Sequence, residues 1–413
     1  MFIRNIEKRL LLALSRNPVT LLNGARQIGK STLALKVAKD KNYHYVNLDK
    51  EIVYLAAKSD PEGFINNLPK PVIIDEIQKV PELFLAIKQD VDQNRIPGRY
   101  LLTGSANPLL IPRLGDSLAG RMGIIELMPL SQGEIEGVEE GFIDWLFSGQ
   151  PPRIFSSNLS RTELHQKILT GGYPNAVLSP DEDARENWLQ DYIGLIINRD
   201  VRDLAQIEKI TELPDLLKLL AIRAAGLLNV ADVSRDCQLI AQTVHRYFAL
   251  LETVFILHLQ QSWHSNLTLR IVKSPKIYLL DSGLLSYLMG MNSQRITTEA
   301  PQAGKILENF IVEELRKQST WSDTRPQLYH FRTSNGQNEV DIVLESRAGD
   351  LIGIEVKHSE RITESDLKGL RYLSEKTGDK FKRGIILYTG QQVVPFGDNL
   401  WAMPVSSLWK TQK

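Results

Sequence analysis

The chain has 413 residues, and its 49 Lys and Arg balance 49 Asp and Glu, so the formal net charge is zero. At about 150 residues per domain, this length predicts two or three domains. Charged residues make up 24% and hydrophobic residues 43% of the chain, values that exclude a disordered or fibrous protein. Zero net charge also excludes a strongly basic nucleic-acid coat and an acidic tail, but it leaves room for a local basic patch.

Cysteine usage and hydropathy predict a soluble, cytoplasmic protein. Cys237 is the single cysteine, which excludes a disulfide framework and a cysteine-based zinc site. We expect it to be a small buried residue. The sequence has no run of about 18 apolar residues, the length that spans a bilayer. The apolar residues from Ile3 to Leu14 instead have the spacing of one helix face.

A phosphate-binding loop follows the first apolar strand. Residues 24–31 match the pattern G-x-x-x-x-G-K-[ST]. The run Val19–Leu22 predicts a buried strand before the loop, and Leu33–Lys39 predicts a helix after it. Backbone N–H groups of such a loop bind phosphates, so Lys30 is expected to reach the β- and γ-phosphates and Ser31 to ligate Mg²⁺. The residues predicted to bind ATP are Gly24, Ala25, Arg26, Gln27, Ile28, Gly29, Lys30, Ser31 and Thr32.

Two acids end a second apolar strand at residues 71–76. The carboxyl ends of strands in a doubly wound sheet lie at the edge where ligands bind. Asp75 is therefore predicted to hold Mg²⁺, directly or through water, and Glu76 to be the catalytic base that activates the attacking water. Two ordinary surface acids are the alternative.

A third strand, residues 99–107, is expected to carry polar side chains toward the γ-phosphate. A plain strand-to-turn transition is the alternative. Residues 43–49 predict a further strand and residues 82–92 an amphipathic helix, and this alternation predicts an α/β fold with a parallel three-layer sheet. The side chains that could orient water or contact the nucleotide are Thr103, Ser105 and Asn107, of which Ser105 is the predicted nucleotide contact.

These segments resemble the AAA+ superfamily. The resemblance rests on the phosphate loop, on Asp75 with Glu76, on the strand end Leu102–Ser105 and on the segment Leu118–Arg121. The order of segments over nearly the whole chain is similar to a prokaryotic family in which an AAA_14-type P-loop module is fused to a DUF4143-type C-terminal region. This resemblance implies ATP binding and hydrolysis, with a biological role that is mostly undefined.

The resemblance also implies an arginine that acts on the transferred phosphoryl group. Arg121 is the predicted arginine finger or sensor, in its own or in a neighbouring subunit. Arg113 is a nearby competitor, and Arg26 is a candidate for contact with phosphate or a partner. Each of them has an ordinary surface arginine as its alternative.

The middle of the chain is predicted to be helical. From Thr162 to Ile207 the apolar spacing is that of helices, with a break at Gly171–Pro174. We expect a lid or connector here, after a turn and helix cap at Pro129–Glu134. The charged run Arg199–Asp203 predicts a solvated face, with a nucleotide-sensing arginine as the alternative.

Residues 213–275 predict a winged helix-turn-helix, whose third helix would enter a DNA major groove. The charge of this region is close to zero, which leaves a protein-contact or lid module as an equal alternative. The predicted helices are residues 216–224, 230–235 and 240–252, and the predicted wing strands are residues 254–259 and 267–272, with the hairpin at residues 263–266. The candidate DNA contacts are Gln242, Thr243, His245 and Arg246.

The C-terminal third contains acids in a metal-binding pattern. Glu355 and Lys357 share one face of a predicted strand, because side chains alternate along a strand. A hairpin would bring Asp341 beside them. Carboxylates hold Mg²⁺ with open water positions, and a lysine can position or activate the attacking water. The predicted elements are a helix at residues 305–315 and strands at residues 328–332, 339–344, 351–357 and 384–388.

This pattern resembles the PD-(D/E)XK nuclease superfamily. Asp341, Glu355 and Lys357 match its D…E-x-K triad, and Glu308 matches the helix-borne acid of many members. Val340 stands where the family motif has Pro. The resemblance implies that Glu308, Asp341 and Glu355 hold Mg²⁺ or Mn²⁺, with Lys357 as a catalytic lysine. An ordinary hairpin is the alternative, and such folds also bind without cutting. Further polar residues near the motif are His358 and Gln391.

Charge is also balanced over residues 293–413, so a nucleic-acid path there must be a local groove. Lys380, Lys382 and Arg383 are candidate contributors, with a solvated loop as the alternative. Residues 294–302 predict a linker before this region.

The predicted domains are an AAA+ nucleotide-binding core at residues 1–130, a helical lid or connector at 131–205, a winged helix-turn-helix at 206–292 and a PD-(D/E)XK-like domain at 293–413. The predicted function is ATP hydrolysis coupled to DNA or RNA binding, with metal-dependent cleavage by the C-terminal acids. Because an arginine finger can act on a neighbouring subunit, we also expect a homo-oligomer. No membrane partner is expected. The alternative is a nucleotide-dependent switch or assembly protein whose last domain binds without cutting.

Overall fold

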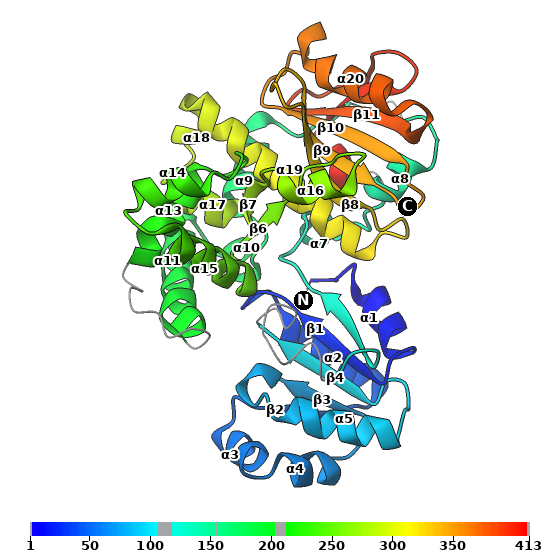
Figure 1. Cartoon of the computed structure of the whole chain (residues 1–413), viewed down its shortest axis with the longest axis vertical. Coiled ribbons are helices and arrows are strands. Elements are labelled where there is room, and N and C mark those ends of the chain that lie inside the picture. Colours follow the sequence, from blue (N-terminus) through cyan, green and yellow to red (C-terminus); the bar gives the residue numbers. More distant parts are fainter. Residues whose placement is uncertain (1, 106–117, 153–155, 203–211, 411–413) are drawn as a thin grey trace. The chain divides into compact units, whose positions relative to one another are not determined.

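The structure is a computed structural model that describes residues 2–105, 118–152, 156–202 and 212–410 (Figure 1). Its described residues divide into two compact units. The N-terminal unit comprises Arg4–Pro129 with Phe248–Ile256, and the C-terminal unit comprises Leu130–Tyr247 and Leu257–Lys413 with the first residues of the chain. The predictions for Asn107, Arg113 and residues 203–207 lie outside the described residues.

A parallel sheet forms the centre of the N-terminal unit. Its strands follow the order β2-β3-β4-β1-β5, which confirms the predicted parallel α/β fold. The described strands are β1 (Val19–Asn23), β2 (His44–Asn47), β3 (Val72–Asp75), β4 (Tyr100–Gly104) and β5 (Met122–Glu126). The described helices are α1 (Glu7–Leu14), α2 (Lys30–Lys41), α3 (Glu51–Ser59), α4 (Pro61–Asn67), the 3-10 helix η1 (Ile77–Lys79) and α5 (Leu83–Gln93).

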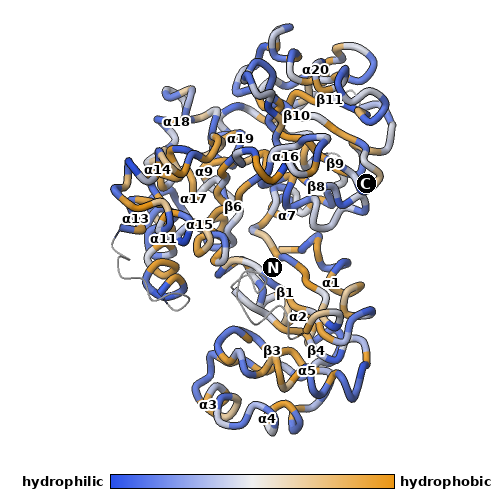
Figure 2. The backbone as a smooth tube through the Cα atoms, viewed as in Figure 1, coloured by the Kyte–Doolittle hydropathy of each residue, from blue (hydrophilic) through white to orange (hydrophobic). Residues whose placement is uncertain are grey.

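The core of this unit follows from the alternation of side chains along each strand. Val19 and Leu21 of β1 pair with Tyr100 and Leu102 of β4, and all four side chains enter one buried cluster. Figure 2 shows β3 and β4 as hydrophobic stretches of the chain. Strands buried in this way carry the polar residues only at their ends, so the sequence itself directs the polar side chains to one edge of the sheet.

The C-terminal unit contains a second, mixed sheet. Strand β10 pairs antiparallel with β9 and parallel with β11, and helices α19 and α20 both pack on it. In the described residues the order is β12-β13-β11-β10-β9-β8. Its strands are β8 (Gln327–Arg332), β9 (Glu339–Glu345), β10 (Leu351–Lys357), β11 (Phe381–Tyr388), β12 (Val394–Pro395) and β13 (Leu400–Pro404). The strands predicted for this region therefore form.

Helices make up most of the rest of the C-terminal unit, and none of its described helices is long and apolar enough to cross a membrane. They are α7 (Gln132–Glu136), α8 (Phe142–Phe147), α9 (Arg161–Thr170), α10 (Pro174–Val177), α11 (Glu182–Leu195), the π-helix η3 (Ile196–Val201), α13 (Leu213–Ile222), α14 (Val230–Asp236), α15 (Ala241–Thr253, shared with the N-terminal unit), α16 (Leu267–Val272), α17 (Ser282–Leu288), α18 (Arg295–Thr298), α19 (Ala300–Trp321), η5 (Glu364–Leu367), α20 (Lys368–Thr377), η6 (Gly378–Lys380) and α21 (Ser407–Lys410).

The predicted wing is partly wrong. Residues 267–272 form helix α16, and β6 (Leu257–Gln260) pairs instead with β7 (Lys276–Leu279). The apolar-polar alternation of this segment favours a strand, but the side chain of Asn266 accepts a hydrogen bond from Thr268 N at 2.9 Å and caps a helix. Local capping thus overrides the period-two pattern.

Two smaller expectations also differ from the structure. Residues 294–302, predicted as a linker, contain α18 and the start of α19, where Pro301 lies in the first turn and needs no N–H donor. Cys237 follows α14 and is half-buried rather than fully buried.

Buried polar contacts hold the start of the C-terminal unit to its longest helix. The ammonium of Lys317 on α19 donates to Leu130 O at 2.9 Å and to the carboxylate of Glu314 at 2.7 Å. The other oxygen of Glu314 accepts from Gln132 N at 2.9 Å. Burial lowers the pKa of Lys317, but the Glu314 carboxylate more than offsets this effect, so the pKa rises and the lysine stays charged. The pair therefore joins segments that are far apart in the sequence.

We predict that Lys317→Ala destabilises the C-terminal unit by about 3–5 kcal/mol, because Glu314 is left as a buried charge without its partner. Every tryptophan of the sequence lies in this unit, so tryptophan fluorescence during urea unfolding reports on it. Lys305→Ala, at an exposed position of the same helix, is the matched control and should change stability by less than about 1 kcal/mol. Equal losses in both variants would contradict the prediction.

Candidate nucleotide site and acidic cluster

The loop between β1 and α2 has the backbone of a phosphate cradle. Gly24 has a φ of +149°, and a Cβ there would lie 2.1 Å from Leu127 O, so a larger residue does not fit. Gly29 ends the loop with a φ of +98° and is the N-cap of α2. Residues 24–32 thus occupy the loop and the first turn of a helix, where backbone N–H groups favour anions.

The Lys30 side chain lies within this loop. Its ammonium donates to Gly24 O at 2.9 Å and to Ala25 O at 2.6 Å, and the residue is only 5% exposed. Arg4, which the sequence did not single out, donates to Ile28 O at 2.9 Å and braces the loop from outside. The Lys30 ammonium therefore lies within the loop that the motif identifies, and its reach to the phosphates of a nucleotide stays a prediction.

Asp75 is buried at the carboxyl end of β3. Its carboxylate accepts hydrogen bonds from Ser31 Oγ at 3.1 Å, from Tyr45 OH at 2.6 Å and from the Thr103 hydroxyl. Burial, and then the hydrogen bond to Asp75, raise the pKa of Tyr45, which stays a neutral donor. Ser31 and Asp75 present hard oxygen atoms side by side, and these oxygens fit the ligand preference of Mg²⁺.

Glu76 turns away from Asp75 because its backbone is left-handed, with a φ of +61°. Its N–H donates to Thr103 Oγ1 at 3.0 Å. Its carboxylate accepts from Gln78 Nε2 and, at 3.4 Å, from Ser105 Oγ. A left-handed conformation at a residue other than glycine costs about 1–3 kcal/mol and is frequent at functional sites. The two adjacent carboxylates thus have separate hydrogen-bond partners, while the Thr103 hydroxyl links Asp75 to the backbone of Glu76.

Tyr45 and Gln78 are functional candidates that the sequence reasoning missed. Gln78 Nε2 also donates to Ser105 Oγ at 2.9 Å, so it holds the side chains predicted as base and nucleotide contact in one network. Gln78 lies only two residues beyond Glu76, which was a usable signal. Tyr45 gave no such signal, since only the pairing of β2 with β3 brings it to Asp75.

The structure does not bring Arg121 to the phosphate loop, so its prediction as a sensor in its own subunit is wrong. β5 runs parallel to β1 with Met122 beside Val19, and Arg121 therefore lies at the amino end of the sheet. The loop follows Asn23 at the opposite end of β1, about 13 Å away at 3.3 Å per residue. Arg121 instead pairs with Asp92 at 2.5 Å.

The predicted C-terminal acids do lie together. β9 and β10 form the expected hairpin, and Val356 N donates to Asp341 Oδ2 at 3.0 Å. Lys357 Nζ lies 3.7 Å from Glu355 and 3.5 Å from Asp366. Glu308 reaches the same place from α19, since Lys276 Nζ lies 2.9 Å from Glu308 and 3.3 Å from Asp341. Spacing along a strand and a helix thus predicted the cluster correctly.

Lys276 is the member of this cluster that sequence reasoning missed. Besides Glu308 and Asp341, its ammonium contacts Glu339 at 3.1 Å, and the side chain is 4% exposed. Tyr278 OH donates to Glu308 at 2.6 Å. Both side chains come from β7, far from the motif in the sequence. Only the tertiary fold identifies them as neighbours of the acids.

The pKa values in this acidic cluster reflect crowding of charge. Burial, and then repulsion by Asp341, raise the pKa of Glu308 to about 7 and hold that of Glu355 well above its usual range. Burial opposes ionisation of Asp341 as well, but the Lys276 ammonium and the Val356 N–H lower its pKa. Burial would lower the pKa of Lys276, yet Tyr278 and the surrounding carboxylates raise it. The lysine is therefore the charged partner of the acids.

As arranged, the acidic cluster does not fit a divalent metal. Lys276 Nζ stands among the carboxylate oxygens that a metal would need, and like charges repel strongly at such distances. Within the described residues, no group of three or more His, Cys, Asp or Glu side chains is placed to hold a metal ion. The prediction that Glu308, Asp341 and Glu355 hold Mg²⁺ or Mn²⁺ is therefore not supported, because a lysine from another part of the fold takes the cation position.

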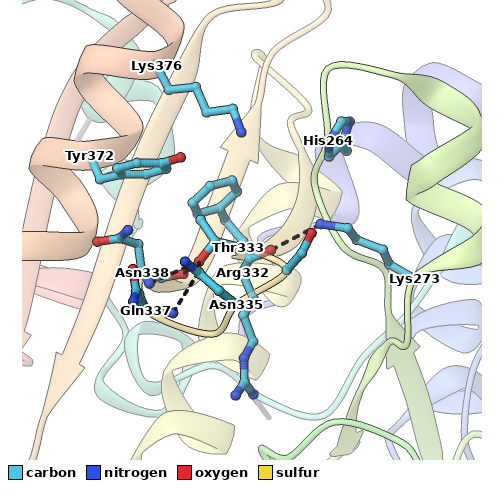
Figure 3. Close-up of a pocket in the computed structure, with 11 residues that line it drawn as sticks. His264, Lys273, Arg332, Thr333, Asn335, Gln337, Asn338, Tyr372 and Lys376 are labelled. Carbon is cyan, nitrogen blue, oxygen red and sulfur yellow. Dashed lines mark hydrogen bonds between the residues drawn. The ribbon is translucent and has the colours of Figure 1, made fainter.

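A basic hollow of about 390 Å³ opens beside the β8–β9 turn (Figure 3). Lys273 and His264 approach it from one side, Tyr372 and Lys376 from α20 on the other. An adjoining hollow of about 500 Å³ shares Lys273 and Arg332. Among the described residues that line either hollow, none is Asp or Glu. Lysine and arginine side chains thus line the hollow without an acid in its lining, although Arg332 also pairs with Glu339 at 3.8 Å.

The other basic candidates have mixed outcomes. Arg383 is buried, with its guanidinium 4.3 Å from the centre of the Trp145 ring and a hydrogen bond to Gln150 O, so it cannot join a surface groove. Lys382 pairs with Asp350 at 3.3 Å. His358 stacks on His165, with a distance of 5.3 Å between ring centres. On α15, Gln242, His245 and Arg246 are exposed and Thr243 is half-buried.

Three protein families match successive parts of the chain. The AAA domain AAA_14 matches residues 16–136, the domain of unknown function DUF8612 matches residues 161–295, and the domain of unknown function DUF4143 matches residues 303–408. Together with the phosphate loop, these matches define the class of the N-terminal part: it is an AAA domain with a P-loop. More particularly, this AAA domain is followed in the same chain by a C-terminal DUF4143 domain, as the sequence resemblance predicted.

The relatives extend this similarity over the whole chain. An uncharacterized protein of Mycobacterium tuberculosis is 29% identical over 409 residues, 99% of this chain and 85% of the relative. An uncharacterized protein of Methanocaldococcus jannaschii is 21% identical over 424 residues, 98% of this chain and 90% of the relative. Among solved structures, a Walker-type ATPase of Pyrococcus abyssi has a TM-score of 0.41 at 14% identity, covering 70% of this chain and 96% of that one. A Holliday junction branch migration motor of Thermotoga maritima has a TM-score of 0.30 at 19% identity, covering 62% and 88%.

We predict an acid-sensitive contribution from His330, which lines the adjoining hollow. Burial, and then the nearby Lys276 and Lys273, lower its pKa to about 4 from the ordinary 6.5. Because the unfolded chain takes up this proton first, stability is full above pH 6.5 and falls as the pH approaches 4. The loss is on the order of 1–3 kcal/mol at about 1.4 kcal/mol per pKa unit. His330→Gln should lose less stability between pH 6.5 and 4.5 in urea unfolding followed by tryptophan fluorescence, and equal slopes would contradict the prediction.

Proposed function

We propose that the chain hydrolyses ATP at the loop between β1 and α2, and that ATP turnover is coupled to nucleic-acid binding by the C-terminal unit. The observation that carries the first part is the contact of Ser31 Oγ with Asp75, 3.1 Å apart, beside a glycine-shaped phosphate loop. The observation that carries the second part is the basic hollow between Lys273 and Lys376.

The ATP site assigns a task to each side chain. Backbone N–H groups of the loop and the Lys30 ammonium bind the phosphates, and Ser31 with Asp75 would hold Mg²⁺, which neutralises phosphate charge when bound. Glu76 accepts the proton of the attacking water. Gln78 and Ser105 fix the orientation of the Glu76 carboxylate. Release of Lys30 from its carbonyl partners accompanies its move to phosphate.

We predict that Lys30→Ala loses ATP affinity and that Glu76→Gln binds ATP but hydrolyses it at least about 100-fold more slowly. The second variant keeps the shape and hydrogen bonds of the side chain but removes the base. Phosphate release and binding of a fluorescent ATP analogue measure the two effects. Lys39→Ala, exposed on the same helix as Lys30, is the control and should match wild type. A Lys30→Ala variant with wild-type turnover would place the site elsewhere.

The basic hollow has the two features that a single-stranded nucleic acid needs. Lys273 and Lys376 offer cations to the phosphate backbone, and Arg332 lies beside them but also pairs with Glu339 at 3.8 Å. The half-buried ring of Tyr372 stacks on the buried ring of Phe331 at a distance of 6.0 Å, and Lys376 lies over both rings, so Tyr372 is the ring that a base can reach. Aromatic faces beside cations are the elements on which unpaired bases stack. The hydroxyl and amide side chains of the β8–β9 turn supply further hydrogen-bond donors.

We predict that the double variant Lys273→Glu with Lys376→Glu weakens binding of a labelled single-stranded oligonucleotide by at least about tenfold at physiological salt. Fluorescence anisotropy of DNA and RNA oligonucleotides measures this, and a salt titration should show a shallower slope for the variant. Lys368→Glu makes the same charge change at an exposed position of α20 outside the hollow and serves as the control. Unchanged affinity in the double variant removes the hollow from the proposal, while ATP hydrolysis remains testable alone.

Helix α15 supplies a second proposed surface for this function. Helices α13, α14 and α15 precede β6 and β7, and Leu227 forms an isolated bridge to Lys276 of β7. Three helices followed by an antiparallel pair of strands is an order similar to that of a winged helix, although α16 lies between the two strands here. The exposure of Gln242, His245 and Arg246 on α15 supports a role in contact with DNA.

Nucleic-acid cleavage by the C-terminal acids is not part of this proposal, because the geometry of the acidic cluster does not fit a metal. The alternative function, a nucleotide-dependent switch or assembly protein, predicts protein partners that bind only with ATP and no oligonucleotide binding. Arg121 retains one proposed role, as an arginine finger for the ATP site of another subunit, which requires a homo-oligomer. Light-scattering mass with and without ATP tests that requirement.

A further inference from the structure

Lys276 is brought to the acidic cluster by a strand whose position is fixed from several sides. β7 pairs with β6, and the backbone of Leu279 exchanges two hydrogen bonds with the side chain of Asn309 on α19, at 2.9 and 3.0 Å. Side chains two residues apart share a strand face, so Lys276 and Tyr278 both reach Glu308. The lysine is therefore held in the cluster rather than resting on its surface.

The ammonium of Lys276 has the surroundings of a bound cation. Carboxylate oxygens of Glu308, Glu339 and Asp341 surround it at 2.9, 3.1 and 3.3 Å. These oxygens come from α19 and from two positions of β9, so the ligand set is assembled by the fold. A lysine within it carries one positive charge where a divalent metal would carry two.

A second lysine offsets part of the remaining negative charge of the cluster. Lys357 Nζ lies 3.7 Å from Glu355 and 3.5 Å from Asp366. Two ammonium groups thus contact the carboxylates. A divalent metal would have to displace the buried Lys276 ammonium, which would leave a buried charge without its partners.

We propose that Lys276 is the resident cation of the C-terminal acidic cluster, and that it closes this cluster to divalent metal while it fixes β7 to α19 and β9. Lys276 is thus a positioning residue that acts through the carboxylates. The C-terminal region then works as a binding module in its folded state, and a metal-competent arrangement exists only when the lysine is withdrawn. This inference concerns the cluster alone and does not depend on ATP hydrolysis or nucleic-acid binding.

The test measures Mn²⁺ binding by electron paramagnetic resonance on the full chain, without nucleotide or nucleic acid. Lys276→Met should gain one Mn²⁺ equivalent over wild type, with an affinity at least about tenfold higher, because the repelling charge is gone. The gain should disappear in the double variant Lys276→Met with Asp341→Asn. Lys305→Met, three residues before Glu308 at an exposed position of α19, is the matched control and should bind Mn²⁺ as wild type does.

A second readout separates metal binding from a purely structural role. Lys276→Met should lower the midpoint temperature of thermal unfolding, followed by tryptophan fluorescence. Added Mn²⁺ should raise this midpoint in the variant and leave that of wild type unchanged. Failure of the Lys276→Met variant to gain a Mn²⁺ equivalent overturns the proposal.

Should Lys276→Met fail to fold, Asp341→Asn in the otherwise wild-type chain still decides the question. It should leave Mn²⁺ binding unchanged, because the wild-type cluster holds no metal. A Mn²⁺ equivalent that wild type has and Asp341→Asn lacks overturns the proposal as well. ATPase assays and oligonucleotide binding are independent of each of these outcomes, so failure of the proposed function would be seen separately.

Discussion

A buried carboxylate must have a partner, and the nature of that partner decides what each site of this protein can do. Asp75 is buried against the hydroxyl groups of Ser31, Tyr45 and Thr103, which are neutral. Its negative charge can therefore act on a cation that arrives with a nucleotide. The acids around Asp341 contact the ammonium of Lys276, which already supplies a positive charge. Two clusters of acids at strand ends thus have opposite relations to metal.

The same constraint explains why the C-terminal unit extends over regions with separate sequence patterns. Lys317 bonds both to Glu314 and to Leu130 O, and Lys276 joins β7 to α19. Each of these lysines is buried and would be costly without its partners. Lys276 therefore joins the segments that match DUF8612 and DUF4143, and Lys317 joins the end of the AAA segment to DUF4143. Neither region can change its packing freely without leaving a buried charge exposed or without its ion-pair partner.

Sequence patterns predicted the strands and motifs that depend on neighbouring residues. The predictions failed where contacts between distant segments determine the structure. Glycine spacing and apolar strands located the phosphate loop and Asp75, and strand alternation placed Glu355 and Lys357 together. The wing strand at residues 267–272 was wrong because the Asn266 cap, worth about 1 kcal/mol, is not visible in a period-two pattern. The prediction of Arg121 as a sensor in its own subunit was wrong because β5 runs parallel to β1, which puts Arg121 at the end of the sheet away from the phosphate loop. Lys276 was missed because nothing in its own segment indicates the acids that it meets.

Zero net charge also has a structural meaning for partner binding. The hollow lined by Lys273, Arg332 and Lys376 contains no Asp or Glu among its described lining residues, while many other lysines are paired internally, as Lys276 and Lys317 are. Paired lysines do not contribute to an external field, because a nearby carboxylate cancels them. A neutral chain can therefore still present a local group of cations, and this is the feature on which the proposed nucleic-acid binding rests.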